Sequence, residues 1–175
     1  FVQTEDGLGE IDTAKFPLAK NLNDVLAALT ALRARIGLVE RSLTNKQPGK
    51  INYEVVSAQA MLKYRRAFQN KDGTRFSQFL DGVKKGTRQI HTETLFPYEV
   101  LRPFFNDCSW SVQDPEGMAA LEQLWNHLPG EIGSANAISV VDTSGSMYWA
   151  EKLKPALISQ AMGLYCAERC PGVFH

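Results

Sequence analysis

Cysteine is scarce in this chain, and long hydrophobic runs are missing. The 175 residues contain three cysteines, Cys108, Cys166 and Cys170, and an odd, sparse set does not build a disulfide framework. We therefore expect buried free thiols and a cytoplasmic protein. No stretch of 18 consecutive apolar residues occurs, so we expect no contact with a membrane.

The sequence also lacks a recognisable catalytic constellation. No Ser-His-Asp, Cys-His or paired-carboxylate arrangement stands out. His91 lies beside a predicted helix start. His127 lies one turn before a predicted helix end, where the helix dipole favours a cation. We predict structural roles for both histidines and a protein that is not an enzyme.

The net charge of the whole chain is zero, but the charged residues are distributed unevenly along it. Residues 50–91 carry nine basic side chains against three acidic ones, a net charge of +6, whereas residues 92–137 carry one basic side chain against seven acidic ones, a net charge of −6. A basic block of this kind marks a polyanion-binding face. The alternative is that the basic block docks on the neighbouring acidic block within the fold, and composition does not decide between the two.

Apolar residues at helical spacing predict a series of short helices up to about residue 130. Asp72-Gly73 should break one of them, Gly86 should end the next, and Pro97 and Pro115 should lie in first turns. The expected helices cover about 23–43, 57–71, 76–85, 97–105, 115–128 and 155–169. Residues 1–20 are expected to form an extended arm.

A different pattern follows the helices. An apolar run, 137–141, leads into Asp142-Thr143-Ser144-Gly145-Ser146. We interpret the run as a buried strand that delivers one carboxylate and two hydroxyls to a loop at its carboxyl end, where ligands bind in open α/β sheets. Asp142, Ser144 and Ser146 form an all-oxygen ligand set, which suits Mg²⁺ or Mn²⁺.

A motif of this kind also has other interpretations. In aspartic proteases Gly follows Asp-Thr directly and no helix follows the loop, whereas here Ser144 intervenes and a helix is predicted. A phosphate-binding loop would need more glycines and a lysine. A turn whose Asp and Ser side chains only cap the next helix remains open.

Several blocks, taken in order, resemble a family of uncharacterised proteins related to the Ro/TROVE ribonucleoproteins. Those proteins join a helical-repeat region to a von Willebrand factor A domain, whose metal-ion-dependent adhesion site has the Asp-x-Ser-x-Ser pattern. The similarity covers roughly residues 35–175. The blocks that carry it are 51–54, 60–68, 75–76, 79–80, 83–86, 95–99 and 140–147.

The resemblance implies a mainly α fold, with short helices packed as a helical-repeat-like region, followed by the first β-α unit of a truncated α/β Rossmann-like A domain. The expected units are an arm at 1–20, a helical region at 21–132 and an incomplete A domain at 133–175. The later metal ligands of such a domain are not in this sequence, so Mg²⁺ binding should be weak or absent if the chain ends at His175.

The same resemblance implies a non-enzymatic scaffold that binds structured or misfolded RNA. The candidate RNA-contacting residues lie in the basic block. Tyr64 and Phe68 are either base-stacking or core residues, and their helical spacing favours the core. The alternative function is a protein-interaction or structural module of a larger assembly, in which the metal grips an acidic partner. The RNA candidates are Lys63, Arg65, Arg66, Arg75, Lys84, Lys85 and Arg88.

Overall fold

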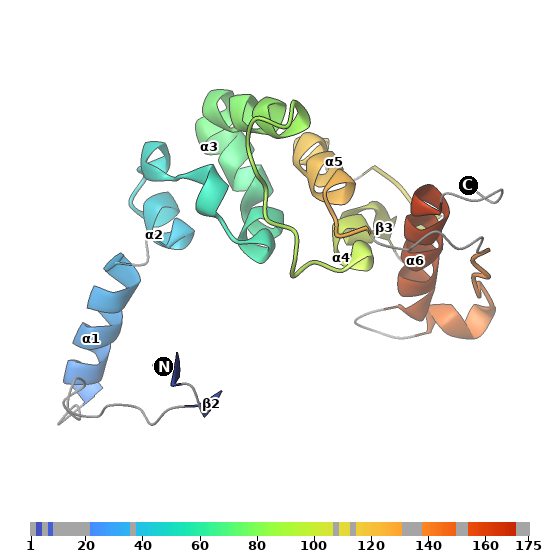
Figure 1. Cartoon of the computed structure of the whole chain (residues 1–175), viewed down its shortest axis with the longest axis horizontal. Coiled ribbons are helices and arrows are strands. Elements are labelled where there is room, and N and C mark those ends of the chain that lie inside the picture. Colours follow the sequence, from blue (N-terminus) through green and yellow to red (C-terminus); the bar gives the residue numbers. More distant parts are fainter. Residues whose placement is uncertain are drawn as a thin grey trace.

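The protein is mainly helical, as the sequence predicts (Figure 1). The computed structural model describes residues 3–4, 7–8, 22–35, 38–106, 109–112, 115–130, 138–149 and 154–170. The α-helices are α1 (Leu22–Arg35), α2 (Val39–Thr44), α3 (Ala58–Lys84), α4 (Pro97–Leu101), α5 (Met118–Asn126) and α6 (Pro155–Arg169). Short 3-10 turns occur at η1 (Pro48–Lys50), η2 (Tyr53–Val55), η3 (Arg102–Phe104) and η4 (Gly145–Tyr148).

The strands of the described residues are two short antiparallel pairs. β1 (Gln3–Thr4) pairs with β2 (Gly7–Leu8), within the predicted arm, and β3 (Phe105–Asn106) pairs with β4 (Ser109–Trp110). β3 and β4 attach to the C-terminal part of the chain, because Trp110 Nε1 donates a 2.7 Å hydrogen bond to Gln160 on α6. Gln160 in turn donates to the Tyr148 hydroxyl at 3.0 Å.

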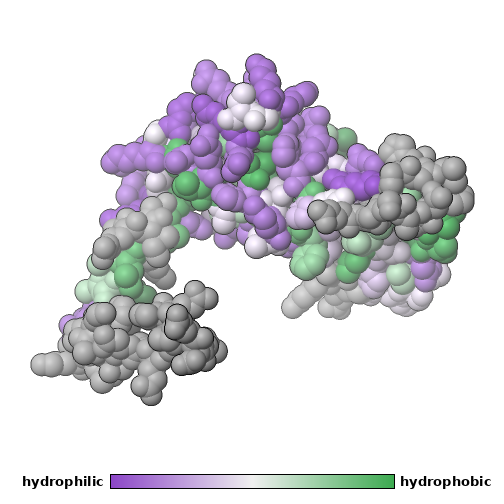
Figure 2. Space-filling model, in the orientation of Figure 1, coloured by the Kyte–Doolittle hydropathy of each residue, from purple (hydrophilic) through white to green (hydrophobic). Residues whose placement is uncertain are grey.

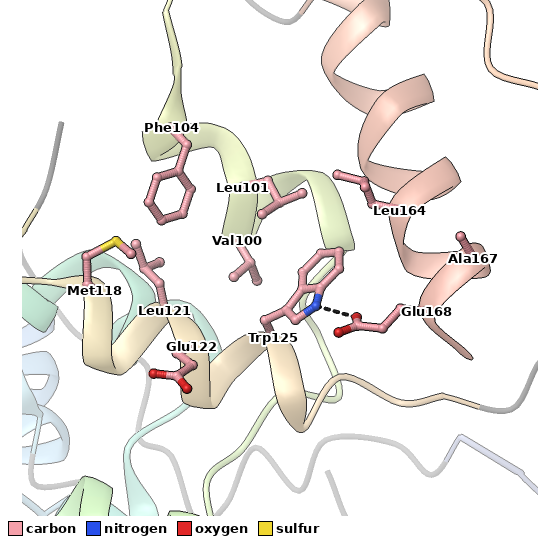
Figure 3. A pocket seen from close by; sticks show the side chains of 10 residues that line it. All are labelled: Val100, Leu101, Phe104, Met118, Leu121, Glu122, Trp125, Leu164, Ala167 and Glu168. Atoms are coloured by element: carbon pink, nitrogen blue, oxygen red, sulfur yellow. Dashed lines mark hydrogen bonds between the residues drawn. The ribbon is translucent and has the colours of Figure 1, made fainter. Parts of the chain in front are cut away.

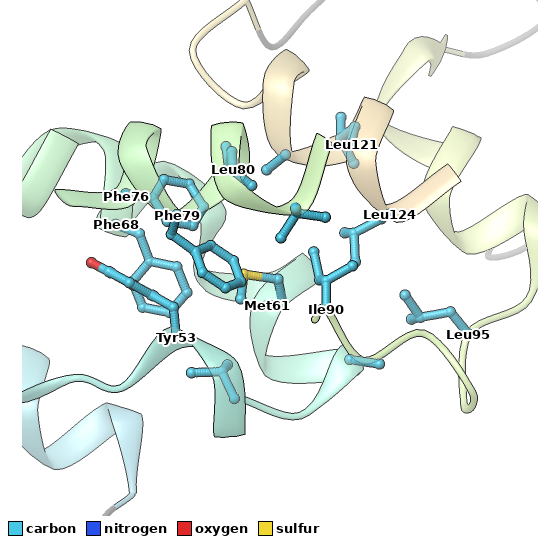
Figure 4. Close-up of a cluster of buried hydrophobic side chains, with 14 of the residues drawn as sticks. Tyr53, Met61, Phe68, Phe76, Phe79, Leu80, Ile90, Leu95, Leu121 and Leu124 are labelled. Carbon is cyan, nitrogen blue, oxygen red and sulfur yellow. The ribbon is translucent and has the colours of Figure 1, made fainter. Parts of the chain in front are cut away.

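The core lies between the two halves of α3, η2 and α5 (Figure 4). The backbone of α3 leaves helical geometry at Asp72, with φ −149° and ψ 39°, at the break that Asp72-Gly73 predicts. This kink brings Phe68 and Phe76, from opposite sides of it, to a ring separation of 5.4 Å. The Tyr53 ring packs against both, at 5.2 and 5.1 Å. Such pairs add about 0.5–1.5 kcal/mol each beyond their buried area.

The ends of several helices follow the sequence signals. α3 ends at Lys84, just before Gly86, whose φ of 71° is a left-handed conformation that favours glycine. Pro97 opens α4 and Pro155 opens α6. α5 is shorter than predicted, because residues 115–117 form a turn and the helix begins at Met118.

The strand predicted at 137–141 is not formed by the described residues of this segment. Residue 137 lies outside the described residues, and residues 138–141 have neither strand pairing nor helical structure. A strand needs a neighbour to satisfy its backbone hydrogen-bonding groups, and the described strands pair only within their own short hairpins. The expected Rossmann-like β-α unit is therefore absent from the described residues, while its helix, α6, is present.

α6 packs against the helical region instead. Its most extensive contacts are with α4. Arg169 reaches α5, donating to the Trp125 carbonyl at 2.7 Å, and its guanidinium lies 4.3 Å from the centre of the Tyr165 ring. Cys170 is buried at the end of α6, and Cys166 is half-buried; both are thiols. None of the helices described combines the length and apolar character that a bilayer crossing requires.

Candidate functional site

A groove with an excess of positive charge lies between the first half of α3, α2, α4 and η3. Its volume is about 800 Å³. Its charged lining consists of four cations, Lys63, Arg65, Arg66 and Arg102, and two carboxylates, Glu40 and Glu99. Three of the predicted RNA-contacting residues thus line one groove, together with Arg102, which the sequence analysis did not select because it lies in the acidic block. Figure 2 shows that the surface over α3 is mostly hydrophilic.

Uncharged side chains of the groove wall donate hydrogen bonds to both carboxylates. Gln59 Nε2 on α3 donates to the two oxygens of Glu99 on α4, at 3.0 and 3.2 Å. Glu99 also accepts the backbone N–H of Phe96 at 2.8 Å, which satisfies a donor at the start of α4. The Tyr64 hydroxyl donates to Glu40 on α2 at 3.0 Å. These bonds tie three elements together around the cations.

Lys63 is exposed at this groove, and its ammonium lies 5.0 Å from the centre of the Tyr64 ring. Its side-chain hydrogen bond with Tyr64, and then the charge interaction with the same group, raise the pKa of Lys63. A lysine is already cationic at neutral pH, and these interactions favour that form further. Phe68 is fully buried in the core, as its helical spacing favours. Tyr64 is half-buried and packs against the core.

Arg75 binds neighbouring parts of the fold and does not line the groove. Its guanidinium donates to the carbonyls of Gly49 and Ile51 and lies 3.4 Å from the Asp72 carboxylate. These contacts hold the segment around η1 against α3. We assign Arg75 a structural role, so its positive charge is already used within the protein.

The other predicted cations lie at the far end of α3, beyond the kink. Lys84, Lys85 and Arg88 are exposed. Arg88 Nε lies 3.8 Å from a Glu54 carboxylate oxygen, a weak exposed pair, and its stem covers Gly82. The basic block therefore divides into a groove-lining group and a group at the end of the helix.

The Asp142 loop forms a local turn. Asp142 Oδ1 accepts the backbone N–H of Ser144 at 2.8 Å, and the hydroxyls of Ser144 and Ser146 lie 3.2 Å apart. The backbone hydrogen bond from Ser144, followed by that of its side chain, lowers the pKa of the exposed Asp142 carboxyl. The described residues contain no cluster of three His, Cys, Asp or Glu side chains that would hold a metal ion. The turn forms without capping the next helix, because the side chain of Ser144 makes no capping hydrogen bond to η4. The Mg²⁺ or Mn²⁺ site stays a prediction.

The two histidines contact their own neighbourhood. His91 Nδ1 lies 3.3 Å from Glu93 at an exposed position. His127 Nδ1 lies 2.8 Å from the Gln123 carbonyl, one turn earlier on α5. The His127 carbonyl accepts the buried Thr92 hydroxyl at 2.5 Å, which anchors the segment before α4.

Sequence reasoning missed an apolar cavity of about 560 Å³ between α4, α5 and α6 (Figure 3). The apolar stripe of α5 was visible in the sequence, but the placement of α6 beside it was not. Trp125 Nε1 donates to Glu168 at 2.6 Å across this site. The cavity is lined by Val100, Leu101, Phe104, Met118, Leu121, Glu122, Trp125, Leu164, Ala167 and Glu168.

Comparison with known families decides the classification. The model of a domain of unknown function, DUF2828, matches residues 18–135. The chain belongs to the DUF2828 family. The matched region contains the groove, the kinked α3 and α5, whereas the Asp142 loop and α6 lie beyond it.

One similar protein is an uncharacterized protein, L728, of Acanthamoeba polyphaga mimivirus. It is 23% identical over 164 residues, which cover 84% of this DUF2828 chain and 27% of the viral protein. The chain thus spans about a quarter of the length of this relative. No solved structure matches the chain.

These findings overturn the resemblance to the Ro/TROVE-related family with a von Willebrand factor A domain. The helical blocks on which that resemblance rested, from 51 to 99, lie inside the DUF2828 match. Neither the family model nor the viral relative carries a Ro/TROVE or A-domain description. The blocks that carried the resemblance are short runs of apolar and basic residues at helical spacing, a pattern that amphipathic helices share whatever the family.

Proposed function

We propose that this chain is a non-enzymatic RNA-binding module whose basic groove holds phosphate groups of the RNA backbone. The observation that carries the proposal is the convergence of Lys63, Arg65, Arg66 and Arg102 on one groove. Phosphate contacts provide affinity and orientation but no base reading. Binding to structured or misfolded RNA should therefore be strongly salt-dependent and weakly selective for sequence.

Two features of the groove support this role. The four cations of the groove outnumber its two carboxylates, Glu40 and Glu99, by two, so the groove has a net positive charge whatever pairs form within it. The cations also come from both α3 and η3, so a strand of RNA entering the groove meets positive charge on two sides. Arginine suits such contacts because its planar guanidinium binds phosphate in a bidentate manner.

The proposal is tested by measuring binding of a fluorescent RNA by anisotropy. A groove variant, Lys63→Glu with Arg66→Glu, is compared with a matched variant, Lys84→Glu with Lys85→Glu, which has the same change in net charge at the far end of α3. Circular dichroism and urea denaturation establish that both are folded. We expect the groove variant to lose at least tenfold in affinity and the matched variant to lose much less.

Two results would contradict the proposal. If the natural sequence binds no RNA at physiological salt, this function is excluded. If the two charge-reversed variants weaken binding equally, net charge rather than the groove determines binding. The same measurement with DNA of the same sequence shows whether binding depends on the 2′-hydroxyl of the ribose. Contacts to phosphate alone do not distinguish RNA from DNA.

A protein-interaction role is the second candidate, and the apolar cavity between α4, α5 and α6 favours it. Exposed apolar surface of this kind marks interaction sites. The cavity includes Met118 and Leu164, which are 37% and 54% exposed. This role does not depend on a metal at Asp142.

A further inference from the structure

α1 presents a row of leucines to solvent. Leu26, Leu29 and Leu32 are 52%, 41% and 43% exposed, and their spacing of three residues places them along one side of the helix. Among the described residues, the hydrophobic core cluster takes no side chain from α1. In Figure 1 the helix projects from the body of the protein, and Figure 2 shows apolar surface on it.

A second apolar surface lies near the other end of the described chain. The cavity between α4, α5 and α6 is bordered by Leu101 and Trp125, and by the exposed Met118 and Leu164 (Figure 3). Uncovered leucines and an uncovered apolar cavity in the same chain are each unfavourable in water. A helix that places its apolar face in a groove removes both surfaces from water.

Charge distinguishes α1 from an arbitrary apolar helix as the occupant. Two carboxylates, Glu122 and Glu168, lie among the cavity residues. Glu168 already accepts Trp125 Nε1 and Arg169, at 2.6 and 3.0 Å. The sequence of α1 ends in Leu32-Arg33-Ala34-Arg35 and contains one acidic residue, Asp24, in its first turn. An α1 in the cavity would bring two arginines to a site with two carboxylates, of which Glu168 is already paired with Arg169 and Glu122 is exposed.

We propose that the α1 leucine row of one copy of this chain docks in the α4–α5–α6 cavity of a second copy. α1 has 14 residues, which corresponds to a helix about 21 Å long. In Figure 1 α1 and α6 lie at opposite ends of the molecule, so the cavity that α1 occupies belongs to another copy. Because each copy carries both surfaces, a reciprocal exchange closes the assembly as a dimer. This inference is independent of RNA binding.

Complementation between two defective variants tests the proposal. Leu29→Glu removes the leucine row and leaves the cavity intact, whereas Leu164→Glu blocks the cavity and leaves the leucine row intact. Both positions are exposed, so the substitutions spare the core. Val140→Glu, at a residue that is 93% exposed, is the matched control. The mass of each 175-residue protein in solution is measured by sedimentation or light scattering at micromolar concentrations.

The natural sequence and Val140→Glu should be dimers, and each of the other two variants alone should be a monomer. An equimolar mixture of Leu29→Glu and Leu164→Glu should regain a dimer, because one intact row meets one intact cavity. A monomeric natural sequence, a dimer that survives either substitution, or a mixture that stays monomeric would overturn the proposal. In the last case another occupant, such as a small apolar ligand or a different protein, fills the cavity.

Discussion

The hydroxyl of Tyr53 donates a 2.9 Å hydrogen bond to the carboxylate of Asp72, the residue at which α3 leaves helical geometry. Arg75 reaches the same carboxylate at 3.4 Å and lies over the Tyr53 ring at 5.3 Å. The bond therefore links η2 to the kink above the aromatic core. Side chains from η2 and α3 therefore hold the kink.

Removing this hydrogen bond should destabilise the protein. Tyr53→Phe keeps the ring in the core and deletes the donor to a charged acceptor, so we expect a loss of about 1.5–3 kcal/mol in the free energy of unfolding. Urea denaturation at neutral pH measures the change. Tyr98→Phe, at a half-buried tyrosine stacked on Phe96, is the control and should change stability by less than about 0.5 kcal/mol. Equal stability of Tyr53→Phe and the natural sequence would show that the bond is not structural.

The same tyrosine should make stability fall at high pH. Burial of the Tyr53 hydroxyl, and then its bond to Asp72, raise the pKa of Tyr53 well above the ordinary value. In the unfolded chain the phenol loses its proton near pH 10, so above that pH ionisation favours the unfolded state by up to about 1.4 kcal/mol per pH unit. The stabilisation is fully present below about pH 10 and is lost above it.

A series of urea denaturation curves across this alkaline range tests the relationship. Tyr53→Phe lacks the titrating group, so the stability advantage of the natural sequence over this variant should shrink as the pH rises. An advantage that stays constant through the titration of the phenol would contradict the raised pKa.

Gly163 allows the segment before the Asp142 loop to lie directly on α6. A Cβ at this position would overlap Cγ2 of Val141. Gly163→Ala should therefore cost about 1–3 kcal/mol from overpacking, although alanine is about 1 kcal/mol better than glycine within a helix. Val141→Ala in the same chain should restore much of the loss, as measured by thermal or urea denaturation. Stabilisation by Gly163→Ala alone would show that the segment does not contact α6.

The turn at Asp142 is open to a direct test by NMR titration. Ser144 has φ −60°, which proline adopts, so Ser144→Pro removes the donor N–H with little backbone strain. The pKa of Asp142 should lie below the ordinary value in the natural sequence and rise toward it in Ser144→Pro. Ser144→Ala keeps the backbone bond and should have a smaller effect. An unchanged pKa in Ser144→Pro would contradict the turn.

Adding Mg²⁺ during the same experiment tests the predicted metal site. If Asp142, Ser144 and Ser146 bind the ion, Mg²⁺ should lower the apparent pKa of Asp142 further, because a cation favours the charged carboxylate. Resonances of residues 142–146 that do not respond to millimolar Mg²⁺ would exclude the site.

Local signals in the sequence predicted much of the helical structure. Pro155 and the following apolar residues predicted the bounds of α6. Asp72-Gly73 predicted a break between two separate helices, and the structure has a kink within α3 at this place. The leucine periodicity from 22 to 43 predicted one helix, but α1 ends at Arg35 and α2 begins at Val39. Periodicity continues across such a break because residues on both sides keep the same apolar character, while Leu38 has extended geometry with ψ 130°.

Features that depend on distant partners were not predicted correctly. The apolar run at 137–141 predicted a strand, but a strand depends on a neighbour that local sequence does not specify. The basic block predicted one surface, and the structure divides it because Arg75 binds the segment around η1 and the kink separates Lys63 from Lys84. Arg102 joins the groove only because α4 and η3 pack beside α3.

The salt dependence of RNA binding tests the central claim most directly. Affinity for a single-stranded RNA is measured over a range of salt concentrations for the natural sequence and for Lys63→Glu with Arg66→Glu. Three or four phosphate contacts in the groove predict a slope of about −2 to −3 in log affinity against log salt, and loss of two contacts should reduce its magnitude by about 1.4. Parallel lines of equal affinity for the two proteins would contradict phosphate binding in the groove.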